Sequence, residues 1–446
     1  MPSPLPDAPP FTLRARLLSP LGDGSTLWLP DGLIAVAADG SISAVRSADD
    51  DPERAADADV IDLRPFTVMP GLVDCHVHLP QIPSAGLGAG MRLLDWLERH
   101  VFALERAFRV EAAERLAPAA YRAMAAAGTT TFAGYGAVWA DSTDACFRVA
   151  DSYGIRAVLG AVMMDRVSYD EETPKLELLD RSLHESALLA ERWHGAADGR
   201  LRYAFTPRFA VSCTEDLLRE SAALASRFDA TWQTHLSEDD VEIARVRELF
   251  PLALDYLDVY ERAGGLGRRA LLAHAIHLSD REVERVVATD SAVAHCPVSN
   301  MFLSSGVMPL ARYRAAGIRV GLGSDVAGAP DLSILTQMRE GFYAQSSRSA
   351  TTSGYPPYPD PLEWLRLGTL GGAEALGLDR LIGSLETGKE ADLIAIDTTP
   401  ADPPEAVAAT DAESVVSRLI FRERHGIVQG AWVRGRRLAM DAPGGA

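Results

Sequence analysis

Residues 71–81 read GLVDCHVHLPQ, an apolar run that ends in two histidines separated by a single residue. On a β-strand, residues two apart point to the same side. A strand here therefore presents His76 and His78 together. Two imidazoles on one face suit a zinc ion, and the carboxyl end of a barrel strand is where barrel active sites lie. The stretch predicts a strand that delivers two metal ligands to one point.

Seven further apolar runs follow downstream and alternate with longer helix-like stretches. They are TTTFAGY, IRAVLGAVM, RYAFTPRF, ATWQTHLSE, ALLAHAIHL, SAVAHCPVSN and IRVGLGSDVAG. Strands that alternate with helices indicate βα units around a parallel sheet, and eight such units fit a (β/α)8 barrel over residues 66–378. A doubly wound open sheet is the alternative, but no G-x-G-x-x-G sequence follows the first strand.

The two ends of the chain have a different sequence pattern from the barrel region. Residues 1–65 contain short strand-like runs with Asp-Gly turns, and the same character returns in residues 379–446. We expect the two ends to pair into one small β-sandwich domain beside the barrel. The predicted class is therefore α/β, with the barrel inserted between the two halves of a β-domain.

Composition narrows the function. The chain has 446 residues, 47% of them hydrophobic, which is enough for a large core, and a formal net charge of -19. That charge disfavours binding to nucleic acid or to anionic membranes. The four cysteines are scattered without a C-x-x-C pair, and the sequence opens without a secretory pattern. We expect a cytoplasmic protein that acts on a small molecule.

Other candidate ligands stand at the ends of the later apolar runs. His235 closes ATWQTH, His274 closes ALLAH and Asp325 closes IRVGLGSD. Each has an ordinary structural explanation by itself: a histidine after a strand is commonly a loop or core residue, and Asp325 could cap a helix. The same placement recurring with His76 and His78 favours one divalent-metal centre.

The two lysines limit the metal count. Some barrel enzymes bridge two metals with a carboxylated lysine, but Lys175 lies in a polar run and Lys389 in a turn near the C-terminus. Neither follows a barrel-like strand. The sequence therefore predicts one metal per chain and argues against Schiff-base catalysis.

Five motifs together resemble the amidohydrolase superfamily. They are PGLVDCHVHLPQ, TWQTHLSED, LLAHAIHLS, AHCPVSNMFLSSG and GLGSDVAG. Narrower details resemble the guanine deaminases within its zinc-dependent ring-deaminase branch: LPQ after the paired histidines, LLDWLERHVFALE, AGTTTFAGY, TPRFAVSC and LGTLGGAEALGL. The match runs in order from about residue 66 to about residue 395.

The resemblance implies a role for each matching residue. The implied zinc ligands are His76, His78, His235 and Asp325. His274 and Asp325 would act beside the metal-bound water, and Glu238 would be the acid–base carboxylate. The residues implied to contact the substrate are Gln81, Arg208, Phe209 and His235. The family is typically a homodimer.

The implied reaction is the hydrolytic deamination of guanine to xanthine and ammonia. A zinc-bound hydroxide would attack C2 while Glu238 protonates N3, Arg208 would donate to O6, and Gln81 offers both a donor and an acceptor to the ring edge.

Alternatives remain. The same machinery serves 8-oxoguanine, pterins and aminotriazines, and iron can occupy such sites. A third alternative is a scaffold protein of this fold that has lost its metal. Loss of a metal ligand would favour that alternative, but all the ligand positions are present here. Glu238 could instead charge the first turn of the next helix. His295 could contact the substrate or a metal ligand, or it could have a structural role. His277 has no assigned role.

Overall fold

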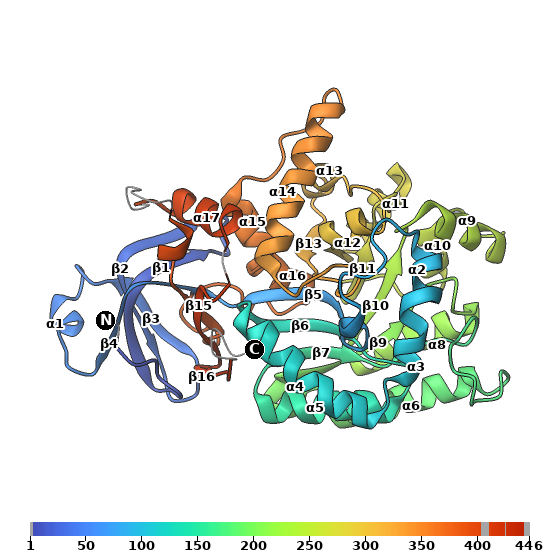
Figure 1. The fold of residues 1–446 in the computed structure, drawn as a ribbon, viewed down its shortest axis with the longest axis horizontal. Helices are drawn as coiled ribbons and strands as arrows, with labels where there is room; N and C mark the ends of the chain where they lie inside the picture. The colour runs from blue at the N-terminus through green and yellow to red at the C-terminus, as the bar shows by residue number, and fades with distance from the viewer. Residues whose placement is uncertain (1–2, 403–409, 424, 441–446) are drawn as a thin grey trace.

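The computed structural model describes residues 3–402, 410–423 and 425–440. They form a barrel-like α/β body and a separate sheet that both ends of the chain build together (Figure 1). Within these residues, no helix is both long and apolar enough to cross a membrane. The four cysteines are buried and free.

The body contains a nine-stranded sheet, in which eight strands follow one another in chain order and β8 pairs with β9 at its side. All of these pairings are parallel. The strands are β5 (Leu72–His78), β6 (Thr129–Tyr135), β7 (Arg156–Gly160), β8 (Val162–Met163), β9 (Leu201–Pro207), β10 (Thr231–Leu236), β11 (Ala270–His274), β12 (Ala292–His295) and β13 (Arg319–Leu322). The eight apolar runs of the sequence contain these nine strands, because IRAVLGAVM supplies both β7 and β8, so the predicted barrel is confirmed.

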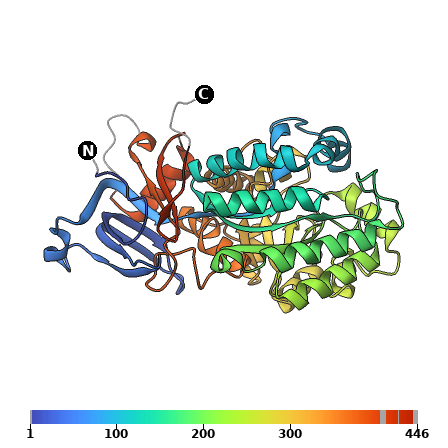
Figure 2. The same ribbon diagram turned by 90° about the horizontal axis from the view of Figure 1, so that it is seen from below.

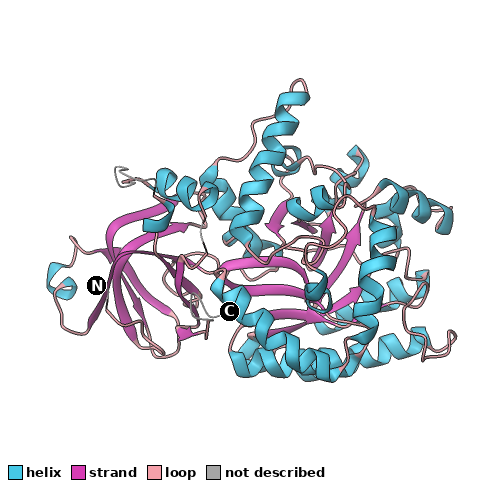
Figure 3. Ribbon diagram, in the orientation of Figure 1, coloured by secondary structure: helices cyan, strands magenta, loops and turns pink. Residues whose placement is uncertain are grey.

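Helices surround the barrel strands (Figure 3). They are α2 (Leu93–Trp96), α3 (Phe102–Ala107), α4 (Val110–Ala126), α5 (Ala140–Tyr153), α6 (Leu178–Trp193), α7 (Ala196–Gly199), α8 (Glu215–Phe228), α9 (Asp240–Leu249), α10 (Tyr256–Arg262), α11 (Asp280–Ala288), α12 (Pro297–Phe302), α13 (Leu310–Ala315), α14 (Ile334–Thr351), α15 (Pro361–Leu367) and α16 (Leu370–Ala375). A 3-10 helix, η1 (Leu79–Ser84), follows β5, and a π-helical turn, η2 (Leu97–Val101), joins α2 to α3. Because both faces of the sheet are covered, β5, β6 and β10 are buried along their whole length.

Small side chains fill the inside of the barrel. Cys75, Ala133 and Ala204 belong to one buried cluster there, and Leu376 and Ile382, from the residues that follow α16, join it. The amino-terminal end of the barrel is therefore plugged by apolar groups. Polar chemistry is left to the opposite end, where the strands finish.

The first and last barrel strands meet through very close backbone approaches. A Cβ added to Gly321 would lie 2.4 Å from Cys75 Sγ, and one added to Gly323 would lie 2.6 Å from His76 Cβ. Beyond the end of β13, the backbone N–H of Asp325 donates to the carbonyl of His76 at 2.7 Å. Glycine in GLGSD thus lets β13 come close enough to β5 for the barrel to close.

A buried carboxylate secures the same junction. Asp74 accepts hydrogen bonds from the backbone N–H and the hydroxyl of Ser324, at 2.9 and 2.5 Å, and from the backbone N–H of His76 at 3.1 Å. Burial raises the pKa of Asp74 to about 6, although these hydrogen bonds oppose the shift. Asp74 therefore links the residue that precedes Asp325 to the backbone of His76.

The second part is one seven-stranded sheet in the order β16-β15-β14-β4-β1-β2-β3. Its strands are β1 (Phe11–Pro20), β2 (Thr26–Val36), β3 (Ile42–Ser47), β4 (Val60–Pro70), β14 (Leu393–Ile396), β15 (Val428–Val433) and β16 (Arg436–Arg437), with the short helices α1 (Pro52–Ala55), η3 (Thr399–Ala401) and α17 (Ala412–Phe421) in its connections. The N-terminal and C-terminal strands lie together at one side of the barrel (Figure 2). The predicted small β-domain from both ends is confirmed.

The two parts are joined covalently and by a buried ion pair. β4 ends at Pro70 and β5 begins at Leu72, so we place the transition at Gly71. Arg156, at the start of β7, pairs with Asp392, just before β14, at 2.8 Å, and also with Glu390. This pair fixes the small sheet against the amino-terminal end of the barrel.

Replacing Gly323 by alanine is expected to destabilise the protein by about 1–3 kcal/mol, the usual cost of overpacking a core, because the new methyl group would collide with His76. Denaturant unfolding of the two proteins measures this. In the matched control Gly22→Ala, the new methyl group comes no closer than 3.6 Å to another residue, and its unfolding free energy should stay within about 0.5 kcal/mol of the parent. Equal stability of Gly323→Ala and the parent would contradict the closure argument.

Candidate active site

The four predicted metal ligands converge at the carboxyl end of the barrel. His78 Nε2 lies 3.2 Å from His235 Nε2, and Asp325 Oδ1 lies 3.2 Å from His76 Nε2 and 3.5 Å from His78 Nε2. Two ligands bound tetrahedrally to zinc at about 2.0–2.1 Å are themselves about 3.3 Å apart. These three contacts therefore fit side chains that surround one metal ion.

The imidazoles are in the protonation state that a metal requires. Burial lowers the pKa of His78 and His235 well below the ordinary histidine value and lowers that of His76 as well. Nδ1 of His76 and Nδ1 of His78 have no hydrogen-bond partner among the described residues, and His76 Nε2 faces only the Asp325 carboxylate, at 3.2 Å. Neutral, buried nitrogens without partners fit a metal site, because a metal ion would supply the partner that they lack.

Neighbouring groups hold these ligands in place. His235 Nδ1 lies 2.6 Å from the backbone carbonyl of Arg208. Nδ1 must carry the proton, because a carbonyl oxygen only accepts, and Nε2 is then free to bind a metal. Burial opposes ionisation of Asp325, but its hydrogen-bonding contact with His76 outweighs this effect and lowers the pKa of Asp325 to about 2. Asp325 is therefore a candidate anionic ligand.

Two more titratable side chains face this centre. Glu238, just after β10, is buried, and its Oε2 lies 3.3 Å from His274 Nε2. His274 Nε2 is also 3.9 Å from Asp325 Oδ2. Burial raises the pKa of Glu238 well above its usual range, and the nearby charge of Asp325 adds to this effect. Glu238 is thus placed to carry a proton beside the ligand cluster.

Backbone conformation at the strand ends is unusual. His274 has a φ of 69° and Asp325 a φ of 49°, and both lie in the left-handed region. Such residues cost about 1–3 kcal/mol each and cluster at functional sites. The geometry that aims these side chains at the centre is therefore held at an energetic cost.

Two residues that orient these groups, Asn300 and Ser305, were not selected by the sequence patterns. Asn300 Oδ1 lies 2.9 Å from His274 Nδ1, and the Ser305 hydroxyl lies 3.5 Å from Glu238 Oε1. His277 Nε2 lies 2.8 Å from the backbone carbonyl of Ser305, so the histidine without an assigned role contacts the loop that reaches Glu238. Both residues lie within the quoted motif AHCPVSNMFLSSG, but nothing in its spacing indicates these contacts.

The candidate substrate residues line a small cavity next to the ligands. Gln81, in η1, and Arg208 and Phe209, just after β9, border it together with Glu238. Apolar side chains complete its wall: Leu93, Trp96, Leu97 and Leu303. The sequence did not single out these apolar residues for the site. The helical segment from α2 to α3 that supplies three of them crosses the end of the barrel remote from the small sheet (Figure 1).

His295 is not part of this cavity lining. It ends β12, is buried, and neither ring nitrogen has a hydrogen-bond partner among the described residues. Burial lowers its pKa to about 3, so it is neutral in the folded protein at ordinary pH.

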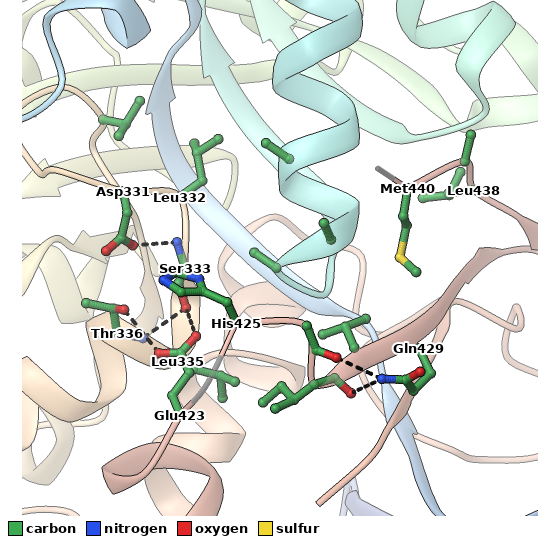
Figure 4. A pocket seen from close by; sticks show the side chains of 18 of the residues that line it. Asp331, Leu332, Ser333, Leu335, Thr336, Glu423, His425, Gln429, Leu438 and Met440 are labelled. Carbon is green, nitrogen blue, oxygen red and sulfur yellow. Dashed lines mark hydrogen bonds between the residues drawn. The ribbon is translucent and has the colours of Figure 1, made fainter. Parts of the chain in front are cut away.

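A larger cleft of about 1240 Å³ lies elsewhere, where the start of α14 faces the end of α4 and the C-terminal strand β15. Several of its polar side chains already have partners: Ser333 and Thr336 donate to Glu423, and Gln429 donates to nearby backbone carbonyls (Figure 4). In the described part of the chain, two groups of side chains are close enough together to hold a metal ion, and neither group borders this cleft. The chemistry is concentrated in the smaller cavity.

Replacing His78 by alanine is expected to reduce tightly bound divalent metal to well below one ion per chain, because the cluster loses one of four ligands. Metal analysis after dialysis measures this. Added zinc should also raise the unfolding midpoint of the parent but not of the variant, since a ligand stabilises the state that binds it. The control His184→Ala removes an exposed histidine of α6 and should keep the metal. Full metal content in His78→Ala would remove His78 from the ligand set.

The depressed pKa of His295 predicts acid sensitivity. The unfolded chain takes up a proton at His295 below about pH 6.5, but the folded chain does not until about pH 3. Stability is therefore lost as the pH falls, by about 1.4 kcal/mol per pH unit for one proton. Between about pH 6 and pH 4.5, His295→Gln should show a shallower fall in unfolding free energy than the parent, whereas the exposed-site control His184→Gln should not. Identical slopes for parent and His295→Gln would refute this origin.

Known proteins resemble the chain over most of its length. The model of the amidohydrolase family matches residues 67–438. A probable guanine deaminase of Deinococcus radiodurans is 40% identical over 380 residues, which cover 82% of each protein.

Solved structures of deaminases resemble this chain over nearly its whole length. A guanine deaminase from C. acetobutylicum with guanine in its active site has a TM-score of 0.89 and 26% identity, and the alignment covers 96% of this chain and 100% of that one. An adenosine deaminase from Xanthomonas campestris with bound zinc has a TM-score of 0.82 and 26% identity, over 97% of this chain and 93% of that one.

The matched family model and the 40% identical relative lead to the same assignment. The chain belongs to the amidohydrolase family, in the branch that contains the guanine deaminases.

Proposed function

We propose that this protein hydrolyses guanine to xanthine and ammonia and that it uses one zinc ion per chain. The observation that carries the proposal is the shared cavity: Arg208 and Gln81 border the same small space as Glu238 and three of the candidate metal ligands. A planar ring with polar edges would lie between groups that bind it and groups that react with it. The similarity to guanine deaminases supports the same substrate.

The ligand set supports zinc. Three neutral imidazoles and one carboxylate are donors that zinc accepts, and the contacts of 3.2–3.5 Å among them suit ligands of one ion. When bound, zinc supplies a water whose pKa is lowered towards about 7. A single ion is supported by Lys389, whose ammonium group pairs with Glu386 outside the barrel and so does not bridge metals.

The residues then divide the proton transfers between them. Asp325 accepts one proton from the attacking water as its oxygen bonds to C2, and Glu238 donates a proton to N3, which makes C2 electrophilic. The tetrahedral adduct at C2 collapses when Glu238 takes back the hydroxyl proton and Asp325 passes its proton to the 2-amino group. The C2–N bond breaks, ammonia leaves, and each guanine consumes one water.

Glu238 suits this role because it is buried and its pKa is raised, so that it carries the proton it must deliver. Its Oε2 lies 3.3 Å from His274 Nε2, and His274 is held by Asn300 from its other side. His274 is therefore placed to orient Glu238 and the attacking water. Phe209 and Trp96 offer aromatic surface to the flat ring.

We further propose a cytoplasmic homodimer, as is typical of the family that the sequence motifs resemble. Light scattering coupled to gel filtration should give about twice the chain mass of 47.9 kDa. A monomer at micromolar concentration would contradict the dimer and leave the reaction unaffected.

The function is tested by incubating the purified, zinc-quantified protein with guanine while purine absorbance and ammonia are followed. Stoichiometric conversion to xanthine with close to one zinc per chain is expected. Zinc without guanine turnover would overturn the substrate, and 8-oxoguanine, pterins and aminotriazines would then be assayed. A protein that binds no zinc and turns over none of these rings would be the scaffold alternative.

Replacing Glu238 by glutamine is expected to lower kcat for guanine by at least about 100-fold, because general acid–base steps contribute roughly 10²–10⁴-fold. The zinc content should not change, since Glu238 is not one of the four proposed ligands. The control Glu248→Gln alters a mostly exposed carboxylate of the following helix, α9, and should retain the parental rate. Parental turnover in Glu238→Gln would exclude this residue as the acid.

A further inference from the structure

Glu105 is a buried carboxylate that joins the two polar residues of the cavity. It lies on α3, at the end of the motif LLDWLERHVFALE, and has no exposed surface. Its Oε1 accepts a hydrogen bond from Gln81 Nε2 at 2.8 Å, and its Oε2 pairs with Arg208 Nη1. Each carboxylate oxygen therefore serves one of the two side chains that border the cavity.

This contact fixes which way the amide of Gln81 points. An ionised carboxylate can only accept hydrogen bonds, so the NH2 group of Gln81 must face Glu105. The amide oxygen Oε1 is then left over. It is buried and has no hydrogen-bond partner among the described residues, and Gln81 lines the cavity. Gln81 consequently offers an acceptor, not a donor, to a bound ring.

The same carboxylate keeps Arg208 charged and in place. Burial by itself lowers the pKa of Arg208, but the negative charge of Glu105 outweighs it, so the pKa lies above the ordinary arginine value. Arg208 thus remains a donor inside a buried site. Its backbone carbonyl also holds His235 at 2.6 Å, which links the ring-binding side of the cavity to the ligand cluster.

We propose that Glu105 is a specificity-determining positioning residue, which rests on the proposed guanine deamination. It presets a donor at Arg208 and an acceptor at Gln81, the complement of O6 and N1–H of guanine. A ring with the opposite order, such as 2,6-diaminopurine with its 6-amino group and unprotonated N1, meets a donor with a donor and an acceptor with an acceptor. Both rings carry the same reactive 2-amino group, so only recognition distinguishes them.

The expected discrimination is large. A site built to hydrogen-bond a substrate edge rejects an analogue that leaves its buried groups unpaired by roughly 10⁴–10⁵-fold. Without Glu105, the amide of Gln81 can turn over and offer its NH2 group to the ring. Loss of this carboxylate should therefore relax the preference between the two rings while the metal centre stays intact.

The test compares kcat/KM for guanine and for 2,6-diaminopurine in the parent and in Glu105→Gln. The parent should prefer guanine strongly. In Glu105→Gln we expect the preference to fall by at least about tenfold, mainly through a higher KM for guanine, with unchanged zinc content. The glutamine introduced at this position cannot accept from both Gln81 and Arg208, because one end of its amide is a donor.

A charge-exchanged double variant, Gln81→Glu with Glu105→Gln, supplies a rescue. The new amide on α3 would accept from Arg208 and donate to the new carboxylate on η1, whose second oxygen would again offer an acceptor to the cavity. The preference for guanine should return to within about tenfold of the parent. This variant keeps the net charge of the site, so it also serves if Glu105→Gln fails to fold because Arg208 has lost its buried partner.

The matched control is Asp392→Asn, which disrupts the buried pair with Arg156 at the opposite end of the barrel. It should lower stability and leave the preference for guanine unchanged. In the parent itself, 1-methylguanine lacks N1–H and leaves the acceptor of Gln81 unpaired. It should therefore bind at least about 100-fold more weakly than guanine.

Failure of the parent to deaminate guanine would overturn the proposed function. If the parent deaminates guanine, an unchanged preference in Glu105→Gln would overturn the role of Glu105, as would a double variant that folds without regaining it. Should neither variant fold, tight binding of 1-methylguanine to the parent would overturn the acceptor role of Gln81, and weak binding would support it.

Discussion

The meeting of the first and last barrel strands is the contact on which the site depends. Asp74 binds Ser324 and the backbone of His76, and the Asp325 N–H donates to the His76 carbonyl. Asp74 and Ser324 are 250 positions apart in the chain. The closure brings His76 and His78, from the start of the barrel sequence, next to Asp325, from its end. It relies on the glycines of GLGSD, where a side chain would not fit.

Burial sets the protonation states of the side chains in the site. The same exclusion of water that holds His76, His78 and His235 neutral also keeps a proton on Glu238. In the proposed mechanism, the imidazole ligands must be unprotonated and the general acid must be protonated, and low polarity favours the uncharged form of both. One physical environment therefore prepares two opposite chemical roles. Arg208 remains charged in it because a buried carboxylate accompanies it.

The strands and the convergence of the candidate ligand residues were predictable from sequence because each is marked by local order. An apolar run followed by a polar residue identifies a strand and the group at its end, and the eight barrel strands and the small terminal sheet follow from that pattern. Glu105, Asn300 and Ser305 were not predictable, because their roles arise from contacts between segments far apart in the chain. LLDWLERHVFALE stood out as a motif, yet only the folded helix shows that its last residue reaches Gln81 and Arg208.

The left-handed backbone at His274 and Asp325 has an evolutionary consequence. Glycine or asparagine would occupy these positions with less strain, so selection for stability alone would replace both residues. A descendant of this chain released from catalysis should drift towards such residues at the ends of β11 and β13. Histidine and aspartate persisting there, in a conformation that penalises them, would mark a lineage in which the reaction is still under selection.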